Sequence, residues 1–201
     1  MKTIIDRNDY LTEINRSKFI GVVAPINSVE EAKEVIKTVK KEYPKANHYC
    51  YGYRFDNYEK SNDDGEPSGT AGRPILEFLK NSDLNNLICV VVRYFGGIKL
   101  GASGLIRAYI DASKNVIDRT TIYNIVEQNI YSIEVEYSLF DVVRKYLEKI
   151  SGFFIKIEYL EKVKIVFASD CLNQDDLFDF AKGKVKINLD GKRNIYVKVE
   201  R

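Results

Sequence analysis

The sequence contains few of the residues that hold metals or cross-link small domains. Its 201 residues include one histidine, His48, and three cysteines, which are Cys50, Cys89 and Cys171. A single histidine excludes a site built from several histidines, and three widely separated cysteines support neither a zinc site nor a disulfide framework. We therefore expect buried free thiols in a reducing cytoplasm. We expect no metal and no cofactor.

The chain also lacks a long hydrophobic run and a large net charge. No apolar segment approaches the ~20 residues that a membrane-spanning helix needs, and charged residues interrupt the N-terminal segment too early for a signal peptide. The net charge is only +2, so any basic patch that could bind nucleic acid has to be local. The composition predicts a globular cytoplasmic protein with no membrane partner.

Glycine, by contrast, is concentrated in one part of the chain. Seven of the twelve glycines lie between Gly65 and Gly104. Because glycine is costly in chain entropy, such a density indicates positive φ angles or a close approach of the backbone to a bound group. The cluster forms two glycine-rich turns, at residues 68–72 and 96–104, and a helical run follows each turn. Helix N termini bind anions through free N–H groups, so we predict a phosphate or polyanion site.

The predicted phosphate- or RNA-binding residues come from these two turns and from basic residues near them. They are Arg54, Gly69, Thr70, Gly72, Arg73, Arg93, Gly96, Gly97, Lys99, Gly101, Ser103 and Arg107. Thr70 is expected to cap the first helix, and Arg73 is suited to bidentate contact with a phosphate. Neither turn has the spacing of a P-loop or of a dinucleotide fingerprint, so nucleotide hydrolysis is not expected. Close packing of a helix on a sheet is the alternative explanation for the second turn.

An acidic motif loop precedes the first turn and consists of Asp63, Asp64, Gly65 and Glu66. Three carboxylates within four positions can bind a divalent cation or perform acid–base chemistry. The alternative is a solvated turn, because Asp-Asp-Gly is common turn chemistry. No HExxH-like or Cys/His spacing accompanies these acids, and the sequence assigns no catalytic residue.

Residues 48–55 form an aromatic, strand-like segment. Alternating aromatic side chains on an exposed sheet face can stack on nucleic-acid bases, although aromatic strands usually belong to a core. We interpret His48, which opens this segment, as structural rather than catalytic.

The periodicity of hydrophobic residues changes near residue 122, and it predicts an α+β protein with two domains, 1–121 and 122–201. In the first half, a polar loop is expected at 57–67. Strands are expected at 17–26, 48–55 and 87–94, and helices at 28–43, 70–79 and 102–117. In the second half, the predicted order β-α-β-β-α-β is that of a ferredoxin-like unit.

Three segments together resemble the IMPACT/YigZ family. They are the aromatic segment 48–55, the sequence DDGEPSGTAGRP at 63–74, and VVRYFGGIKLGASGLIRAY at 91–109. The resemblance implies that residues 1–121 form the family's N-terminal domain, similar to the second domain of ribosomal protein S5, with helices on one face of a mixed sheet. It implies a ferredoxin-like C-terminal domain, an association with regulation of translation, and RNA or the ribosome as suspected partners.

We therefore expect a non-catalytic RNA- or ribosome-associated binding protein linked to regulation of translation. Two alternatives stay open. One is a metal- or phosphate-dependent enzyme that uses Asp63, Asp64 and Glu66. The other is a protein-interaction module in stress or translation control, with a protein partner that contacts the polar loop.

Overall fold

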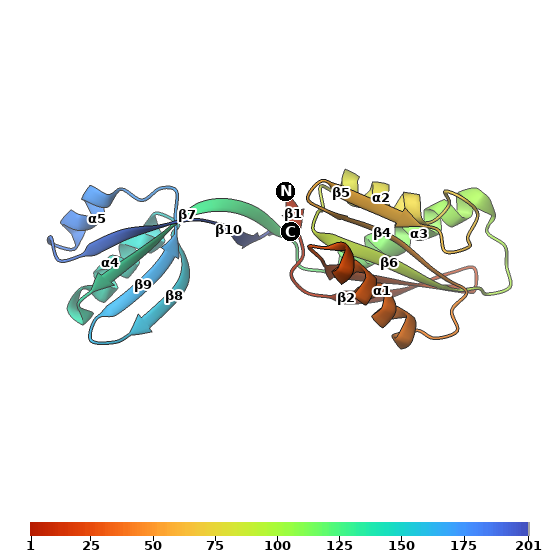
Figure 1. Cartoon of the computed structure of the whole chain (residues 1–201), viewed down its shortest axis with the longest axis horizontal. Helices are drawn as coiled ribbons and strands as arrows, with labels where there is room; N and C mark the ends of the chain where they lie inside the picture. The colour runs from red at the N-terminus through yellow and green to blue at the C-terminus, as the bar shows by residue number, and fades with distance from the viewer. Residues whose placement is uncertain (201) are drawn as a thin grey trace. The chain divides into compact units, whose positions relative to one another are not determined.

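The chain forms two compact units in a computed structural model that describes residues 1–200. Unit 1 contains Met1–Asn124 and the segment from Val197 onward, and unit 2 contains Ile125–Tyr196 (Figure 1). The first division lies a few residues after the expected boundary at 121/122. The return of the C-terminal segment to unit 1 has no counterpart in the periodicity of the sequence.

Unit 1 is built around a five-stranded antiparallel sheet in the order β2-β3-β6-β4-β5. Its strands are β2 (Asn8–Ile14), β3 (Ser17–Pro25), β4 (His48–Phe55), β5 (Tyr58–Asn62) and β6 (Leu87–Tyr94). The central strand β6 is buried along almost its whole length, as its continuous hydrophobic run predicts. A short strand, β1 (Lys2–Thr3), pairs with the beginning of β7 (Tyr123–Val135).

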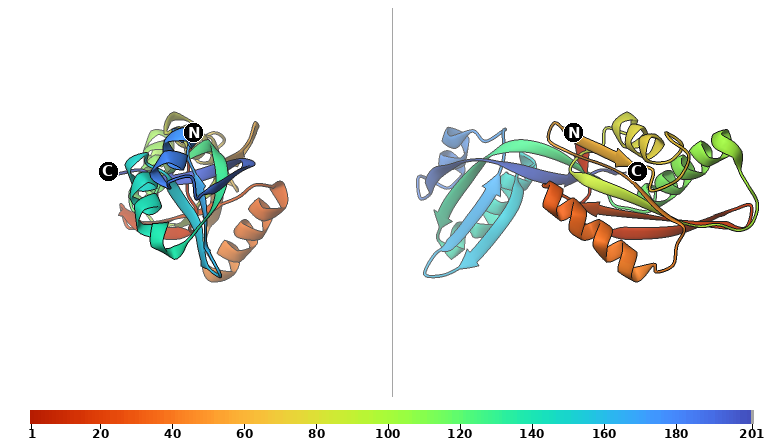
Figure 2. Two further views of the ribbon diagram at one scale, coloured as in Figure 1. Left: turned by 90° about the vertical axis from the view of Figure 1, so that its left-hand side faces the viewer. Right: turned by 45° about the vertical axis from the view of Figure 1, so that its right-hand side comes forward.

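Helices cover both faces of this sheet (Figure 2). They are α1 (Val29–Glu42), α2 (Gly72–Asn81) and α3 (Gly101–Ile117). Alternate residues of β6 belong to two cores: Cys89 and Val91 lie in the core with α2 and α3, and Val90 and Val92 in the core with α1. The expectation of helices on one face of a mixed sheet is therefore wrong, because the sheet is antiparallel and α1 covers its second face.

The start of α1 follows the capping box that the sequence predicts. The side chain of Ser28 accepts a hydrogen bond from the Glu31 N–H at 3.1 Å. The Glu31 carboxylate reaches back to the N–H of Asn27, one residue before the cap, at 2.7 Å. These bonds satisfy amide donors that the first helical turn leaves free.

Half of the predicted polar loop at 57–67 is instead the edge strand β5. Asp56, with φ 47°, and Asn57 form a two-residue turn that brings Tyr58 opposite Phe55. An edge strand needs few hydrophobic residues, so its polar sequence resembles a loop. The rings of Tyr53, Phe55 and Tyr58 stack on one another. Because these aromatic faces contact each other, the structure favours packing over base stacking for the aromatic segment.

Unit 2 has the element order that the periodicity predicts. After β7 come α4 (Tyr137–Lys149), β8 (Phe153–Tyr159), β9 (Val163–Ala168), α5 (Gln174–Phe180) and β10 (Lys186–Lys198). β7 pairs with both β9 and β10, and β9 pairs with β8. Asn173 caps α5 by accepting from the N–H groups of Asp175 and Asp176. This arrangement is consistent with a ferredoxin-like unit.

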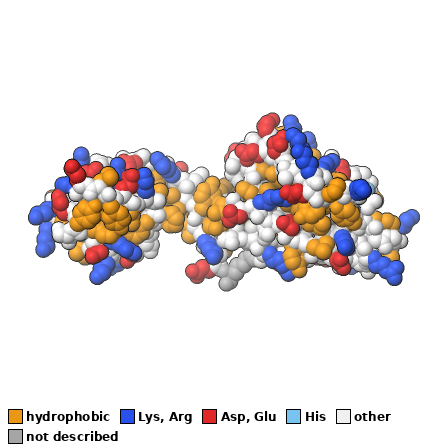
Figure 3. Space-filling view, turned by 90° about the horizontal axis from the view of Figure 1, so that it is seen from below, with side chains coloured by type: hydrophobic (Ala, Val, Ile, Leu, Met, Phe, Trp, Pro, Cys, Tyr) orange, Lys and Arg blue, Asp and Glu red, His pale blue; other side chains and the backbone are white. Residues whose placement is uncertain are grey.

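Several large hydrophobic side chains of unit 2 are exposed. Tyr137, Tyr159, Leu160 and Phe178 each expose half or more of their surface. Figure 3 shows hydrophobic side chains gathered on one face of this unit, with charged residues around them. None of the helices within residues 1–200 combines the length and the hydrophobicity that crossing a membrane requires.

Gly52 on β4 provides a test of the packing between α2 and the sheet. A Cβ at this position would lie 2.7 Å from the backbone nitrogen of Leu76 in α2. Gly52→Ala therefore has to displace α2, and we expect it to lower the free energy of unfolding by about 1–3 kcal/mol. Urea denaturation measures the change. Ser61→Ala, at the paired position on β5, is the control and should change the value by less than about 0.5 kcal/mol.

Candidate anion-binding site

The first glycine-rich turn is already occupied by a carboxylate of the chain itself. One oxygen of Asp63 accepts hydrogen bonds from the N–H groups of Ala71 and Gly72, at 3.1 and 2.8 Å. The other oxygen accepts from the Gly69 N–H at 2.9 Å. These amides were predicted to be free for a phosphate, and that prediction is wrong. Asp63 supplies the negative charge that the N terminus of α2 favours.

The expected cap of α2 is also wrong. The N-cap residue is Ala71, and Thr70 instead donates its hydroxyl hydrogen to the Pro67 carbonyl at 2.7 Å. Asp63, which provides the capping side chain, lies eight positions before the N-cap residue Ala71. A capping side chain at that distance cannot be recognised from the residues next to the helix start. The glycines of this turn let the backbone wrap around the Asp63 side chain.

The three acids of the motif loop contact three different sets of partners. Asp63 binds the turn before α2, whereas Asp64 accepts from the Tyr49 N–H at 2.7 Å. Glu66 points inward, with a side chain that is only 3% exposed. Among the described residues, no three His, Cys, Asp or Glu side chains are grouped so that they could hold a metal ion. The geometry gives no support to a metal site in this loop.

Glu66 is the centre of a buried polar cluster. Its Oε1 accepts hydrogen bonds from Nη1 of Arg93 at 2.6 Å and from the hydroxyl of Tyr109 at 2.7 Å. The Cys50 thiol lies 3.3 Å from that hydroxyl. Arg93 is the last residue but one of the buried strand β6, Tyr109 belongs to α3, and Cys50 belongs to β4. One carboxylate therefore connects the motif loop to the strand, the helix and the neighbouring strand.

His48 lies beside this cluster. Its Nδ1 is 2.9 Å from the carbonyl oxygen of Asp64, and its Nε2 is 3.9 Å from Oε1 of Glu66. A carbonyl oxygen can only accept, so Nδ1 carries the hydrogen of this bond. In the neutral imidazole, Nε2 is then an acceptor. The interpretation of His48 as structural accounts for Nδ1 but leaves Nε2 without an assigned role.

The second glycine-rich turn borders a cavity of about 450 Å³, which we call the pocket. Its wall includes the first residues of α3, Gly101 and Ala102, together with Lys99 and Phe95, and His48, Glu66 and Arg93 line it as well. Within the described part of the chain, the first turn of α3 has no side-chain cap and no acidic residue. The pocket therefore combines a helix N terminus with a lysine, and both favour an anion.

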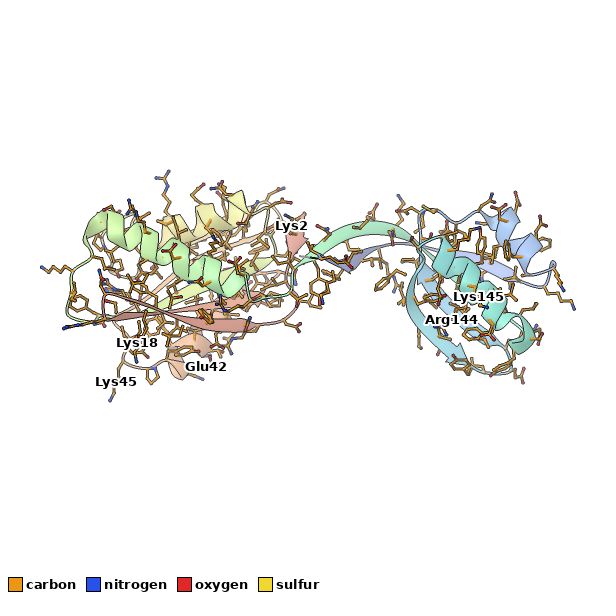
Figure 4. The ribbon with its side chains drawn as sticks, turned by 180° about the vertical axis from the view of Figure 1, so that it is seen from behind. Lys2, Lys18, Glu42, Lys45, Arg144 and Lys145 are labelled. Carbon is orange, nitrogen blue, oxygen red and sulfur yellow. The ribbon has the colours of Figure 1, made fainter. Side chains whose placement is uncertain are left out.

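Exposed basic residues surround this end of the sheet in unit 1. Lys18 lies opposite Tyr94 in the register of β3 and β6, and Lys45 follows the Pro44 carbonyl that accepts from the Tyr94 hydroxyl. Both point outward at the same end (Figure 4). The backbone of Arg16 packs against Gly96. We call Arg16, Lys18, Lys45 and Lys99 the basic rim.

The structure brings together only some of the predicted binding residues. Arg93, Lys99 and Gly101 line the pocket, and Ser103 is exposed in the first turn of α3. Arg54 lies near the other end of β4, opposite Glu59 of β5. Arg73 and Gly69 line a separate groove between α2 and α3. Five members of the predicted set do not line the pocket. Thr70, Gly96 and Gly97 lie in the turns, Gly72 begins α2, and Arg107 lies within α3.

The sequence does not single out Phe95 of the pocket, Tyr109 of the polar cluster around Glu66, or three members of the basic rim. Tyr109 lies on the hydrophobic face of α3, where an aromatic residue is unremarkable. The antiparallel pairing of β3 with β6 brings Lys18 to this end of the sheet. Lys45 is brought there by the hydrogen bond from the Tyr94 hydroxyl to the Pro44 carbonyl. The signal that could have found Tyr109 is its place within the family segment 91–109.

Comparison with known proteins identifies the relatives of this chain. A family model described as the Impact N-terminal domain matches residues 15–117. The chain is 38% identical over 168 residues to IMPACT family member YvyE of Bacillus subtilis, and this alignment covers 81% of this chain and 76% of the relative. It is 32% identical over 184 residues to IMPACT family member YigZ of Escherichia coli, and this alignment covers 87% of this chain and 90% of the relative. The crystal structure of a hypothetical protein matches with a TM-score of 0.60 and 29% identity, over 92% of this chain and 95% of the other.

Removal of the Asp63 carboxylate tests its role as the cap of α2. Asp63→Ala leaves three N–H groups without their acceptor, and we expect the free energy of unfolding to fall by about 1–2 kcal/mol. Asp63→Asn keeps an acceptor oxygen but loses the charge, so its free energy of unfolding should lie between the values of wild type and Asp63→Ala. Asp111→Ala, an exposed acid on α3, is the control. Equal urea midpoints for Asp63→Ala and the control would contradict the assignment.

The cysteines should differ in reactivity. Burial raises the pKa of the Cys50 and Cys89 thiols to about 12. Cys171 is exposed, so the expectation of a buried thiol is wrong at that position. Because the thiolate is the reactive form, iodoacetamide at pH 8 should modify only Cys171 in the native protein and all three cysteines in urea. Intact mass spectrometry counts the adducts. Two rapid adducts in the native state would contradict the burial of Cys50 or Cys89.

Proposed function

The chain belongs to the IMPACT family, and on that premise we propose that it is a non-catalytic binding protein that attaches to RNA or the ribosome and contributes to regulation of translation. The link to translation is what membership of the family implies. RNA as the ligand is supported by the pocket and the basic rim.

The observation that carries the proposal is the convergence of anion-binding groups at one end of unit 1. The first turn of α3 has no acidic residue, and Lys99 precedes it. Arg16, Lys18 and Lys45 are exposed around the same end. A nucleic-acid backbone presents a row of phosphates, and several basic side chains on one rim can contact successive phosphates at once.

The two alternative functions have less support in the geometry. An enzyme using Asp63, Asp64 and Glu66 needs these carboxylates to converge on a substrate or a cation, and each has a different set of partners. A protein partner docking on the motif loop cannot contact the Glu66 carboxylate, because the side chain is buried. Of the three acids only Glu66 lines the pocket, whereas Asp63 caps the turn before α2.

The salt dependence of RNA binding tests the proposal. We expect wild-type protein to bind a mixed-sequence single-stranded RNA at ~50 mM KCl and to lose affinity steeply by ~200 mM. Lys99→Ala should reduce the slope of log affinity against log salt by about one, because one phosphate contact is lost. Fluorescence anisotropy with a labelled RNA measures both quantities.

Lys33→Ala is the matched control, since it removes the same charge from an exposed position on α1 that does not line the pocket. Its slope should equal that of wild type. No RNA binding by wild type at ~50 mM salt, a permissive level, would overturn the proposal. An equal loss of slope in Lys33→Ala and Lys99→Ala would show that binding does not use the basic rim.

A further inference from the structure

We propose that the pocket holds the terminal nucleotide of an RNA whose end carries a phosphomonoester. This inference rests on the proposed function, because it specifies which part of an RNA the site takes. The groups that carry it are the start of α3, Lys99, Arg93, Phe95 and His48, all of which line the pocket.

The first step concerns the phosphate. Gly101 has φ +72°, and within residues 1–200 nothing lies within 4 Å of the place where its Cβ would be. The backbone at the start of α3 is thus open on that side, and a side chain there would be strained. Lys99 adds a full positive charge at the same wall. A phosphomonoester carries about −1.5 to −2 charges at neutral pH, whereas an internal phosphodiester carries a single negative charge. The start of α3 and Lys99 therefore attract a phosphomonoester more strongly.

The Arg93 side chain, which lines the pocket, supplies a second, independent indication of a ligand. The Arg93 side chain is 6% exposed, and its Nη1 donates to Glu66. Its Nε has no hydrogen-bond partner among the described residues, although it is buried. Buried donors in native proteins are nearly always paired. Nε itself has almost no accessible surface, so a phosphate oxygen reaches it only after the Arg93 side chain shifts. A guanidinium group binds such an oxygen well.

The side wall suits the rest of a nucleotide. The Phe95 ring is 45% exposed, and the Arg93 guanidinium lies 5.4 Å from its centroid, so the ring is supported from one side. An exposed, supported ring is a platform on which a base can stack. Nε2 of His48, an acceptor in the neutral imidazole, can bind a ribose hydroxyl.

The size of the pocket favours a chain end over an internal segment. Its volume of about 450 Å³ lies in the range of sites that enclose one small ligand. The buried pair of Glu66 and Arg93 lines it. The basic rim lies outside, where the phosphates of the following nucleotides would run.

The test compares single-stranded RNAs of one sequence that differ only at their ends. The oligonucleotides carry a 5′-phosphate, a 3′-phosphate, or hydroxyl groups at both ends, and anisotropy measures their affinity for the full-length protein. We expect one phosphorylated form to bind about tenfold more tightly than the hydroxyl form, an effect within the range of helix-terminus and lysine contacts combined. Lys99→Ala and Phe95→Ala should each remove most of this advantage, and Lys33→Ala should keep it.

Competition identifies the source of the phosphate. A nucleoside monophosphate should displace the phosphorylated RNA, whereas inorganic phosphate at the same concentration should do so much less, because it has no base to stack on Phe95. Displacement by a phosphoserine peptide but not by the nucleotide would show that the pocket binds a protein partner, and would overturn the inference.

The remaining outcomes separate this inference from the proposed function. Salt-dependent binding that is equal for all three ends would overturn the terminal-nucleotide pocket and leave the RNA-binding function intact. Binding of the nucleoside monophosphate, sensitive to Lys99→Ala, without any RNA affinity would support the pocket and overturn the RNA-binding function. Binding of neither ligand would overturn both.

Discussion

The bond between Glu66 and Arg93 determines the form of the candidate site. Burying two opposite charges costs desolvation free energy, and a buried pair of this kind is weak evidence for stability. What it supplies here is position, because Glu66 also accepts from Tyr109. The motif loop, the end of β6 and the middle of α3 are thereby held at one point. This bond therefore positions two of the side chains that line the pocket.

The two glycine-rich turns show opposite solutions to one electrostatic problem. Each helix that follows a turn begins with N–H groups that lack partners within the helix. At α2 the chain folds Asp63 back onto these groups, so that turn is complete in itself. At α3 the turn carries no acid and faces a cavity. The difference lies in one carboxylate, and it makes the first turn structural and the second the candidate for binding.

The sequence contained most of the fold but only part of the site. Strong local signals identified the capping box at Ser28, the buried strand β6 and the element order of unit 2. β5 was missed because an edge strand needs only one hydrophobic face, and its residues are mostly polar. Asp63 was recognised as part of a motif, yet its partners are six to nine residues away along the chain. Such a contact depends on how the turn folds, which periodicity does not report.

The basic rim shows why a nearly neutral protein can still present a site for a polyanion. Arg16 and Lys18 flank the beginning of β3, Lys45 follows α1, and Lys99 follows β6. Because β3 runs antiparallel to β6, the beginning of one strand lies beside the end of the other. Separate, unremarkable charges thus meet at one end of the sheet, and the net charge of +2 does not measure the local potential there. Screening at physiological salt acts over about 8 Å, so a ligand near this end is governed by these neighbours and by the start of α3 more than by the acids elsewhere on the molecule.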